Sequence, residues 1–325
     1  MFTAPLIGNY GVPKPTLDSL NLPSNFESPN IHVKGIIVSD YSVKYSHHSA
    51  VESLADWCVR ENIPGITGVD TRALVTYLRS SGSTLAALSP PEEAESQLKN
   101  STYDSSRNLV QIASTKTRKV YEPPHPTPDN IHVLLVDYGA KLGIIRCLVE
   151  RGIKVTVVPW NTSLIYETSE REYNGVLLSN GPGDPLNCPL AITNLTEFLD
   201  TSFAKKTPVF GICMGHQMLG LAGGFSSYKM KFGNRGHNQP VVDAVTGRCY
   251  MTSQNHGYAL NVAGVVDGWK ERFVNRNDAS NEGLMHLVYP WNSVQFHPEA
   301  RGGPLDTEFL FDEFMDKCVA MKRAL

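Results

Sequence analysis

Several features that would assign this chain to a common functional class are missing from its sequence. None of the six cysteines forms a Cys-x-x-Cys pair, which argues against a redox motif or a zinc ribbon. No uninterrupted apolar run is long enough to cross a bilayer, so we expect no membrane span. Residues 1–8 have neither signal-peptide nor transit-peptide character. Unpaired thiols in a chain of 325 residues fit a reducing, intracellular compartment.

Motifs for nucleotides, nucleic acids and metals are absent too. The turn at 180–184 (NGPGD) follows an apolar run, but it is neither a Gly-x-Gly-x-x-Gly fingerprint nor a phosphate loop. The net charge is −3 with both signs mixed along the chain, so no nucleic-acid partner is expected. The ten histidines include no His-Glu-x-x-His and no closely spaced ligand set, and we expect no metal.

Proline and polar residues concentrate between positions 89 and 130, which is typical of a connector. We place a domain boundary near residue 125, giving domains 1–125 and 126–325. In the first domain, residues 31–38 favour a strand, and residues 50–60 and 70–79 have helical periodicity. Asp70 or Thr71 would cap the second helix. These elements predict a small mixed α/β domain.

After the boundary, short apolar strands alternate with helices. Strands are expected at 132–137, 154–159, 175–179 and 208–212, and helices at 142–151 and 190–199. This alternation predicts an α/β fold with a doubly wound, mostly parallel sheet covered on both faces. Active sites in such sheets lie at the carboxyl ends of the strands. The glycine turn at 181–183 and the cysteine at 213 both fall there.

Two glycines flank a cysteine directly after the last of these strands. Gly211 and Gly215 surround Cys213 as in a nucleophile elbow, where a strand turns sharply into a helix. Glycine permits the tight turn, and the start of the helix favours a thiolate. Because most buried cysteines are inert core residues, a catalytic role also requires a base.

A base and its orienting acid occur together in the segment QFHPE at 295–299. Pro298 disfavours a helix, and in extended backbone His297 and Glu299 point to the same side. The carboxylate would then hold the imidazole against the thiol. His256 is an alternative base, although its polar segment 252–258 also fits a substrate-contact loop. Residues 233–240 are expected to form another polar loop.

Further segments carry a resemblance to a known family. The cysteine and histidine motifs resemble those of class I glutamine amidotransferases. Over nearly the whole chain, the sequence resembles the small subunit of glutamine-hydrolysing carbamoyl-phosphate synthase, through residues 5–11 (PLIGNYG), 68–72 (GVDTR), 178–185 (LSNGPGDP), 232–240 (FGNRGHNQP) and 253–258 (SQNHGY). Residues 26–33 and 298–307 are most similar to the fungal arginine-pathway type. The multifunctional pyrimidine-pathway protein is the alternative.

The resemblance implies hydrolysis of glutamine to glutamate and ammonia. Cys213 would attack the amide and form a thioester, His297 would carry the proton, and Glu299 would orient His297. Ammonia would pass to a large subunit that binds ATP, magnesium and bicarbonate, so no cofactor is implied in this chain. The resemblance implies backbone donors for the oxyanion at Gly181 and Met214, and contacts to glutamine at Gly183, Gln217, Asn255, Gly257 and Tyr258.

The family's N-terminal domain normally begins further upstream. Domain 1–125 is therefore expected to be incomplete, without a serine that contacts glutamine, and to be less resistant to proteolysis than domain 126–325. A mitochondrial matrix or cytoplasmic location is left open. Two other functions also stay open, a partner-independent hydrolase of γ-glutamyl bonds and a non-catalytic scaffold for the large subunit.

Overall fold

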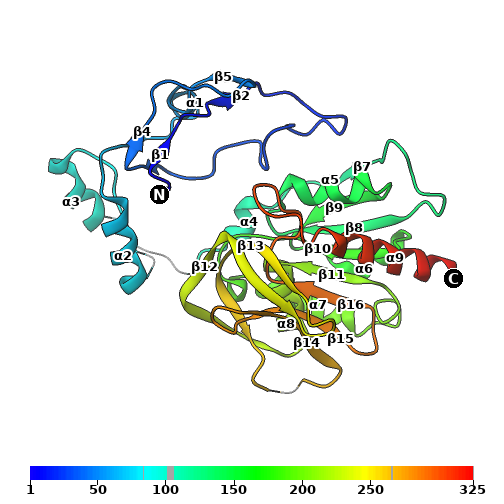
Figure 1. The fold of residues 1–325 in the computed structure, drawn as a ribbon. Helices are drawn as coiled ribbons and strands as arrows, with labels where there is room; N and C mark the ends of the chain where they lie inside the picture. The colour runs from blue at the N-terminus through cyan, green and yellow to red at the C-terminus, as the bar shows by residue number, and fades with distance from the viewer. Residues whose placement is uncertain (83, 101–105, 265, 325) are drawn as a thin grey trace. The chain divides into compact units, whose positions relative to one another are not determined.

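The computed structural model describes residues 1–82, 84–100, 106–264 and 266–324, and the chain divides into two compact units (Figure 1). The units are Met1–Ser105 and Ser106–Leu325, so the division falls earlier than position 125. Helix α4 (Leu109–Ala113) and strand β7 (Lys119–Tyr121) lie in the second unit, where β7 pairs with a sheet strand. The polar, proline-rich composition around them gave no sign of these elements.

The first unit is a small mixed α/β structure, as the sequence predicts. Among the residues of this unit that the structure describes, the strands form three short pairs: β1 (Leu6–Ile7) with β4 (Asp40–Tyr41), β2 (Val12–Pro13) with β5 (Ala50–Glu52), and β3 (Ile36–Ile37) with β6 (Gly65–Ile66). Its helices are α1 (Leu54–Arg60), α2 (Thr71–Ser81) and α3 (Pro91–Lys99). The predicted cap is confirmed, because the Asp70 carboxylate accepts from the Ala73 backbone N–H at 2.9 Å.

The second unit is built on a ten-stranded sheet in the order β13-β12-β14-β15-β16-β11-β10-β8-β9-β7. Five neighbouring strands in its middle run parallel: β16 (Trp291–Val294), β11 (Val209–Ile212), β10 (Gly175–Leu178), β8 (His132–Asp137) and β9 (Lys154–Pro159). The predicted strands of this region are confirmed. Their carboxyl ends lie at one edge of the sheet, where the chemistry was expected.

Antiparallel strands extend the sheet beyond β16. They are β15 (Asn281–His286), β14 (Trp269–Asn275), β12 (Ser226–Asp243) and β13 (Cys249–Asn261). The prediction of polar loops at 233–240 and 252–258 was wrong, since these residues lie within β12 and β13. Antiparallel strands can leave one face in water and so accept polar side chains. Two register shifts in the pairing of β12 with β13 further obscure the alternation of polar and apolar residues.

Helices cover both faces of the parallel strands, as a doubly wound fold requires (Figure 1). Helices α5 (Leu142–Glu150) and α9 (Phe309–Arg323) lie on one face, where Phe210 packs against Phe311 and Phe314 of α9. On the other face lie α6 (Leu164–Glu170), α7 (Pro189–Leu199) and α8 (Met214–Ala222), in a buried cluster that includes Val209. Neighbouring residues of one strand thus point into the two cores. Among the described residues, no helix meets the length and apolarity needed to span a membrane.

Helix α8 approaches the sheet closely because its first turn contains glycine. A Cβ atom at Gly215 would fall on the backbone carbonyl of Leu178 at the end of β10. The Gly215 N–H donates to the carbonyl oxygen of Ser179 at 2.9 Å, which fixes this approach. A Cβ at Gly211 would meet Gly215 in turn. The two elbow glycines are therefore required by packing.

Substituting Gly215→Ala should lower the free energy of unfolding by about 3 kcal/mol, because the clash is with backbone that cannot rotate away. Urea denaturation followed by circular dichroism measures this difference. Gly264→Ala is the matched control, since a Cβ there meets no atom within 4 Å. Equal stability of the two variants would contradict the packing argument.

Candidate active site

Cys213 lies at the junction between β11 and α8 in a backbone conformation rare for a side-chain-bearing residue. Its φ is 53° and its ψ is −101°, which places it in a strained turn. Its N–H donates to the carbonyl oxygen of Val294 at 2.8 Å, so the turn is tied to the end of the neighbouring strand β16. This is the nucleophile-elbow geometry expected from the flanking glycines.

The residues after β16 bring a base and an acid to this cysteine. His297 acts on the nearby Cys213 thiol and lowers its pKa, and Nδ1 of His297 lies 2.7 Å from Oε1 of Glu299. The backbone N–H of His297 donates to the Ser253 carbonyl oxygen at 2.9 Å, which anchors the segment on β13. The structure thus places the three residues predicted to act together, Cys213, His297 and Glu299, in one chain of contacts.

Burial and charge act against each other in this triad. Burial would raise the pKa of the Cys213 thiol, but the charge and hydrogen bond of His297 outweigh it and lower that pKa below its usual value. Burial lowers the pKa of His297, but Glu299 and the thiolate raise it to about 10. Burial raises the pKa of Glu299, but His297 and Lys141 lower it to about 2. These shifts favour the charged forms of all three groups: a thiolate at Cys213, an imidazolium at His297 and a carboxylate at Glu299.

Lys141 is a functional neighbour that the sequence analysis did not single out. Its Nζ lies 2.9 Å from Oε1 of Glu299, and its backbone N–H donates to Oδ1 of Asn180 at 2.9 Å. The residue precedes α5 and follows the carboxyl end of β8. That position in a parallel sheet was the signal that could have identified it.

The proposed oxyanion donors occupy positions suited to that role. Met214 is the first residue of α8, and a helix leaves the N–H groups of its first turn without intrahelical acceptors. Gly181 follows β10, and a Cβ there would fall on the backbone carbonyl of Tyr138. Gly183, in the same turn, has a φ of 91°, and a Cβ added there would lie 3.4 Å from the Cβ of Leu109 in α4. The turn thus needs glycine at both positions.

The remaining expected substrate positions lie on α8 and β13. The Nε2 of buried Gln217 donates to the carbonyl oxygen of Tyr258 at 2.9 Å, which links the helix to the strand. On β13, Asn255 is exposed and Gly257 is half-buried. The structure therefore brings Tyr258 into contact with Gln217, which lies on the helix that begins directly after Cys213.

The alternative base, His256, is engaged elsewhere. It is buried, with its Nε2 3.5 Å from Oε1 of Glu282 and its Nδ1 3.0 Å from the Tyr258 carbonyl oxygen. The Glu282 carboxylate raises the pKa of His256 despite the opposing effect of burial. Both histidines lower the pKa of the Cys213 thiol, and His297 has the larger effect. This arrangement favours His297 as the base.

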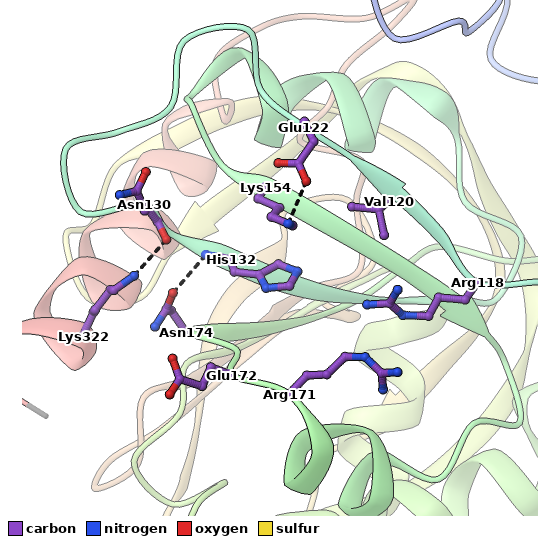
Figure 2. A pocket seen from close by; sticks show the side chains of 10 residues that line it. All are labelled: Arg118, Val120, Glu122, Asn130, His132, Lys154, Arg171, Glu172, Asn174 and Lys322. Atoms are coloured by element: carbon purple, nitrogen blue, oxygen red, sulfur yellow. Dashed lines mark hydrogen bonds and ion pairs between the residues drawn. The ribbon is translucent and has the colours of Figure 1, made fainter.

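A cavity of about 710 Å³ lies at the opposite end of the parallel strands (Figure 2). It is lined by Arg118, Val120, Glu122, Asn130, His132, Lys154, Arg171, Glu172, Asn174 and Lys322. His132 and Lys154 begin β8 and β9, so the cavity is at the amino ends of the strands.

The cationic side chains of this cavity already have partners. Arg118 and Arg171 both pair with Glu167, and Lys154 pairs with Glu122 at 2.7 Å. Lys322 donates to the carbonyl oxygen of Asn130 at 2.9 Å. Because these charges are satisfied within the protein, we assign the chemistry to the Cys213 end of the sheet.

Comparisons with known proteins agree with this geometry. Residues 134–317 match the family described as glutamine amidotransferase class-I, and residues 1–88 match the CPSase domain of the carbamoyl-phosphate synthase small chain. A solved structure described as that of a GMP synthase subunit from Thermoplasma acidophilum is 20% identical and has a TM-score of 0.52. It covers 60% of this chain and 97% of its own, and shows likeness of fold alone.

The sequence relatives are far more similar. The carbamoyl phosphate synthase arginine-specific small chain of Neurospora crassa is 49% identical over 99% of this chain and 70% of the relative. The protein of the same name from Saccharomyces cerevisiae is 49% identical over 97% of this chain and 76% of the relative. The chain therefore belongs to the carbamoyl phosphate synthase small chain family, and its second unit carries a class I glutamine amidotransferase domain.

Proposed function

We propose that this chain hydrolyses glutamine to glutamate and ammonia through a covalent thioester on Cys213. The observation that carries the proposal is the continuous set of contacts from the thiol through His297 to Glu299. A nucleophile, a base and an orienting acid in this order are what acyl transfer requires. Membership of the carbamoyl phosphate synthase small chain family supports glutamine as the substrate.

In the first half of the reaction, the Cys213 thiolate attacks the carbon of the side-chain amide. Negative charge develops on the amide oxygen, and the backbone N–H groups of Gly181 and Met214 would stabilise it. The His297 imidazolium donates a proton to the departing nitrogen, which leaves as ammonia. Glu299 stabilises the imidazolium before this transfer and holds the ring in place.

In the second half, His297 is neutral and accepts a proton from water. The water oxygen attacks the thioester carbon, the carbon–sulfur bond breaks, and Cys213 leaves as a thiolate. Glutamate is released, and the thiolate–imidazolium pair is restored. Each proton taken by His297 is thus returned within one cycle.

We assign substrate contacts to the positions at which the family resemblance implies them. The glutamine backbone groups would be held by the residues that the family resemblance implies, namely Gly183, Gln217, Asn255, Gly257 and Tyr258. The contact between Gln217 and Tyr258 supports a shared role, because it joins α8 and β13 beside the nucleophile.

The product ammonia would pass to a carbamoyl phosphate synthase large chain. That partner would supply the ATP, magnesium and bicarbonate chemistry, and this chain would need no cofactor of its own. The arginine pathway is the favoured setting, since the relatives from Neurospora crassa and Saccharomyces cerevisiae are both named arginine-specific. A purely structural role as a scaffold is disfavoured by the intact contacts of Cys213.

Replacing Cys213 by Ser should reduce glutamine hydrolysis by at least about 10³-fold, because an alcohol lacks the low pKa and nucleophilicity of this thiol. Glutamate release is measured with and without a carbamoyl phosphate synthase large chain. Cys249→Ser is the matched control, because this cysteine is exposed, and it should keep full activity.

The same assay separates the competing functions. Stimulation by the large chain that disappears in Cys213→Ser supports the proposal. Full turnover without the large chain would point to an independent γ-glutamyl hydrolase. Absence of turnover in the wild type while the large chain still binds would point to a scaffold.

Glu299→Gln should lower kcat/KM by about 10²-fold to 10⁴-fold, by analogy with loss of the orienting acid in other triads. Glu299 raises the pKa of His297, so its removal lowers that pKa and the imidazolium is lost at lower pH. The alkaline limb of the pH–rate profile should therefore move to lower pH.

The matched control for this variant is Glu167→Gln, which alters a buried carboxylate near the amino ends of the strands. It should leave the alkaline limb in place. An unchanged limb in Glu299→Gln would show that this carboxylate does not set the protonation of His297.

A further inference from the structure

The Cys213 sulfur has a second polar neighbour, which the reaction described above does not use. Gln295 is fully buried, and its Nε2 lies 3.6 Å from Sγ of Cys213, a hydrogen-bonding distance for the large sulfur atom. The residue follows directly on β16, and its backbone N–H donates to the Glu282 carbonyl oxygen at 2.9 Å. Its side chain is thus held beside the nucleophile from within the core.

The surroundings determine which end of the Gln295 amide faces the sulfur. The carbonyl oxygen of Tyr258 can only accept, so it requires the NH₂ group of Gln217, 2.9 Å away. The same NH₂ group donates to Oε1 of Gln295 at 2.9 Å. With its oxygen occupied in this way, Gln295 must turn its own NH₂ group toward Cys213.

We propose that Gln295 is a further catalytic residue, whose carboxamide donates an N–H···S hydrogen bond that stabilises the Cys213 thiolate, and that Gln217 holds it in that orientation. The proposal rests on the proposed glutamine hydrolysis. A hydrogen bond to the charged form of a group favours that form, so the donor makes the thiolate more abundant before attack. It also stabilises the sulfur when the thioester carbon–sulfur bond breaks and the electron pair returns to sulfur.

The arrangement also connects substrate binding with the nucleophile. Both N–H groups of Gln217 are used, one by Tyr258 and one by Gln295. Gln217 would therefore meet glutamine through its own Oε1, and the donor that matches this atom is the substrate's α-ammonium group. A shift of Gln217 on binding would be passed through Gln295 to the sulfur, because the two amides share one hydrogen bond.

The test follows alkylation of Cys213 by iodoacetamide as a function of pH in the full chain without glutamine. All variants carry Cys249→Ser, since Cys249 is the exposed member of the six cysteines and would react as well. In Gln295→Leu, the midpoint of the rate profile should rise by about one pH unit, with an about tenfold slower reaction below it.

The matched control is Ser293→Ala, in β16 two residues before Gln295. The Ser293 hydroxyl is buried and bonds to Nδ1 of His216 at 2.9 Å, so this variant also removes a buried hydrogen bond but leaves the sulfur contact alone. Its alkylation profile should match that of the parent. Thermal unfolding of each variant shows whether it is folded.

Gln217→Leu tests the other end of the contact. A residue that only binds glutamine would leave the profile of the free protein unchanged, whereas loss of the anchor for Gln295 should raise the midpoint. If Gln295→Leu does not fold, Gln217→Leu carries the test alone, and an unchanged midpoint in it overturns the proposal.

An unchanged midpoint in folded Gln295→Leu would overturn the proposal. If the midpoint of folded Gln295→Leu rises, an unchanged midpoint in Gln217→Leu would remove only Gln217 from the proposal. Because alkylation needs no turnover, these outcomes are separate from the activity assay. If the midpoint rises but the parent chain releases no glutamate, the hydrogen bond to the sulfur stands and the proposed hydrolysis is overturned instead.

Discussion

The charges around Cys213 have to balance inside the protein, because little water reaches them. The thiolate, the His297 imidazolium and the Glu299 carboxylate alternate in sign along one line of contacts, and the Lys141 ammonium follows next. An isolated ion in such a place would change its protonation state and become neutral. Here each ion stabilises the next, and the four formal charges add to zero. The reactivity of the sulfur and the stability of the site therefore have the same origin.

The parallel sheet makes this balance possible by collecting residues from distant parts of the chain. Lys141 comes after β8, Cys213 after β11, and His297 and Glu299 after β16. These strands run in the same direction, so their carboxyl ends face one edge of the sheet. The glycine at 215 then lets α8 sit against β10 and brings the nucleophile to that edge.

The sequence predicted a strand or a catalytic residue correctly wherever the residues that define it lie together in one short segment. The apolar runs that form β8 to β11 are such segments, and so are the glycine-flanked Cys213 and the pair His297 and Glu299. Strands β12 and β13 were missed because their polar, partly exposed residues do not alternate cleanly. Lys141 and Gln295 were missed because their roles come from partners far along the chain. Only the folded arrangement brings such partners together.

The place of β16 in the sheet has a consequence for synthesis on the ribosome. This strand lies between β11 and β15, yet it is translated more than seventy residues after β11. Until it emerges, β11 has an open side and Cys213 has neither its imidazole nor its amide neighbour. A nascent chain therefore carries an ordinary thiol at this position. The reactive form arises only after β16 and the segment that follows it have been made and have joined the sheet, which shields the sulfur from unwanted chemistry until then.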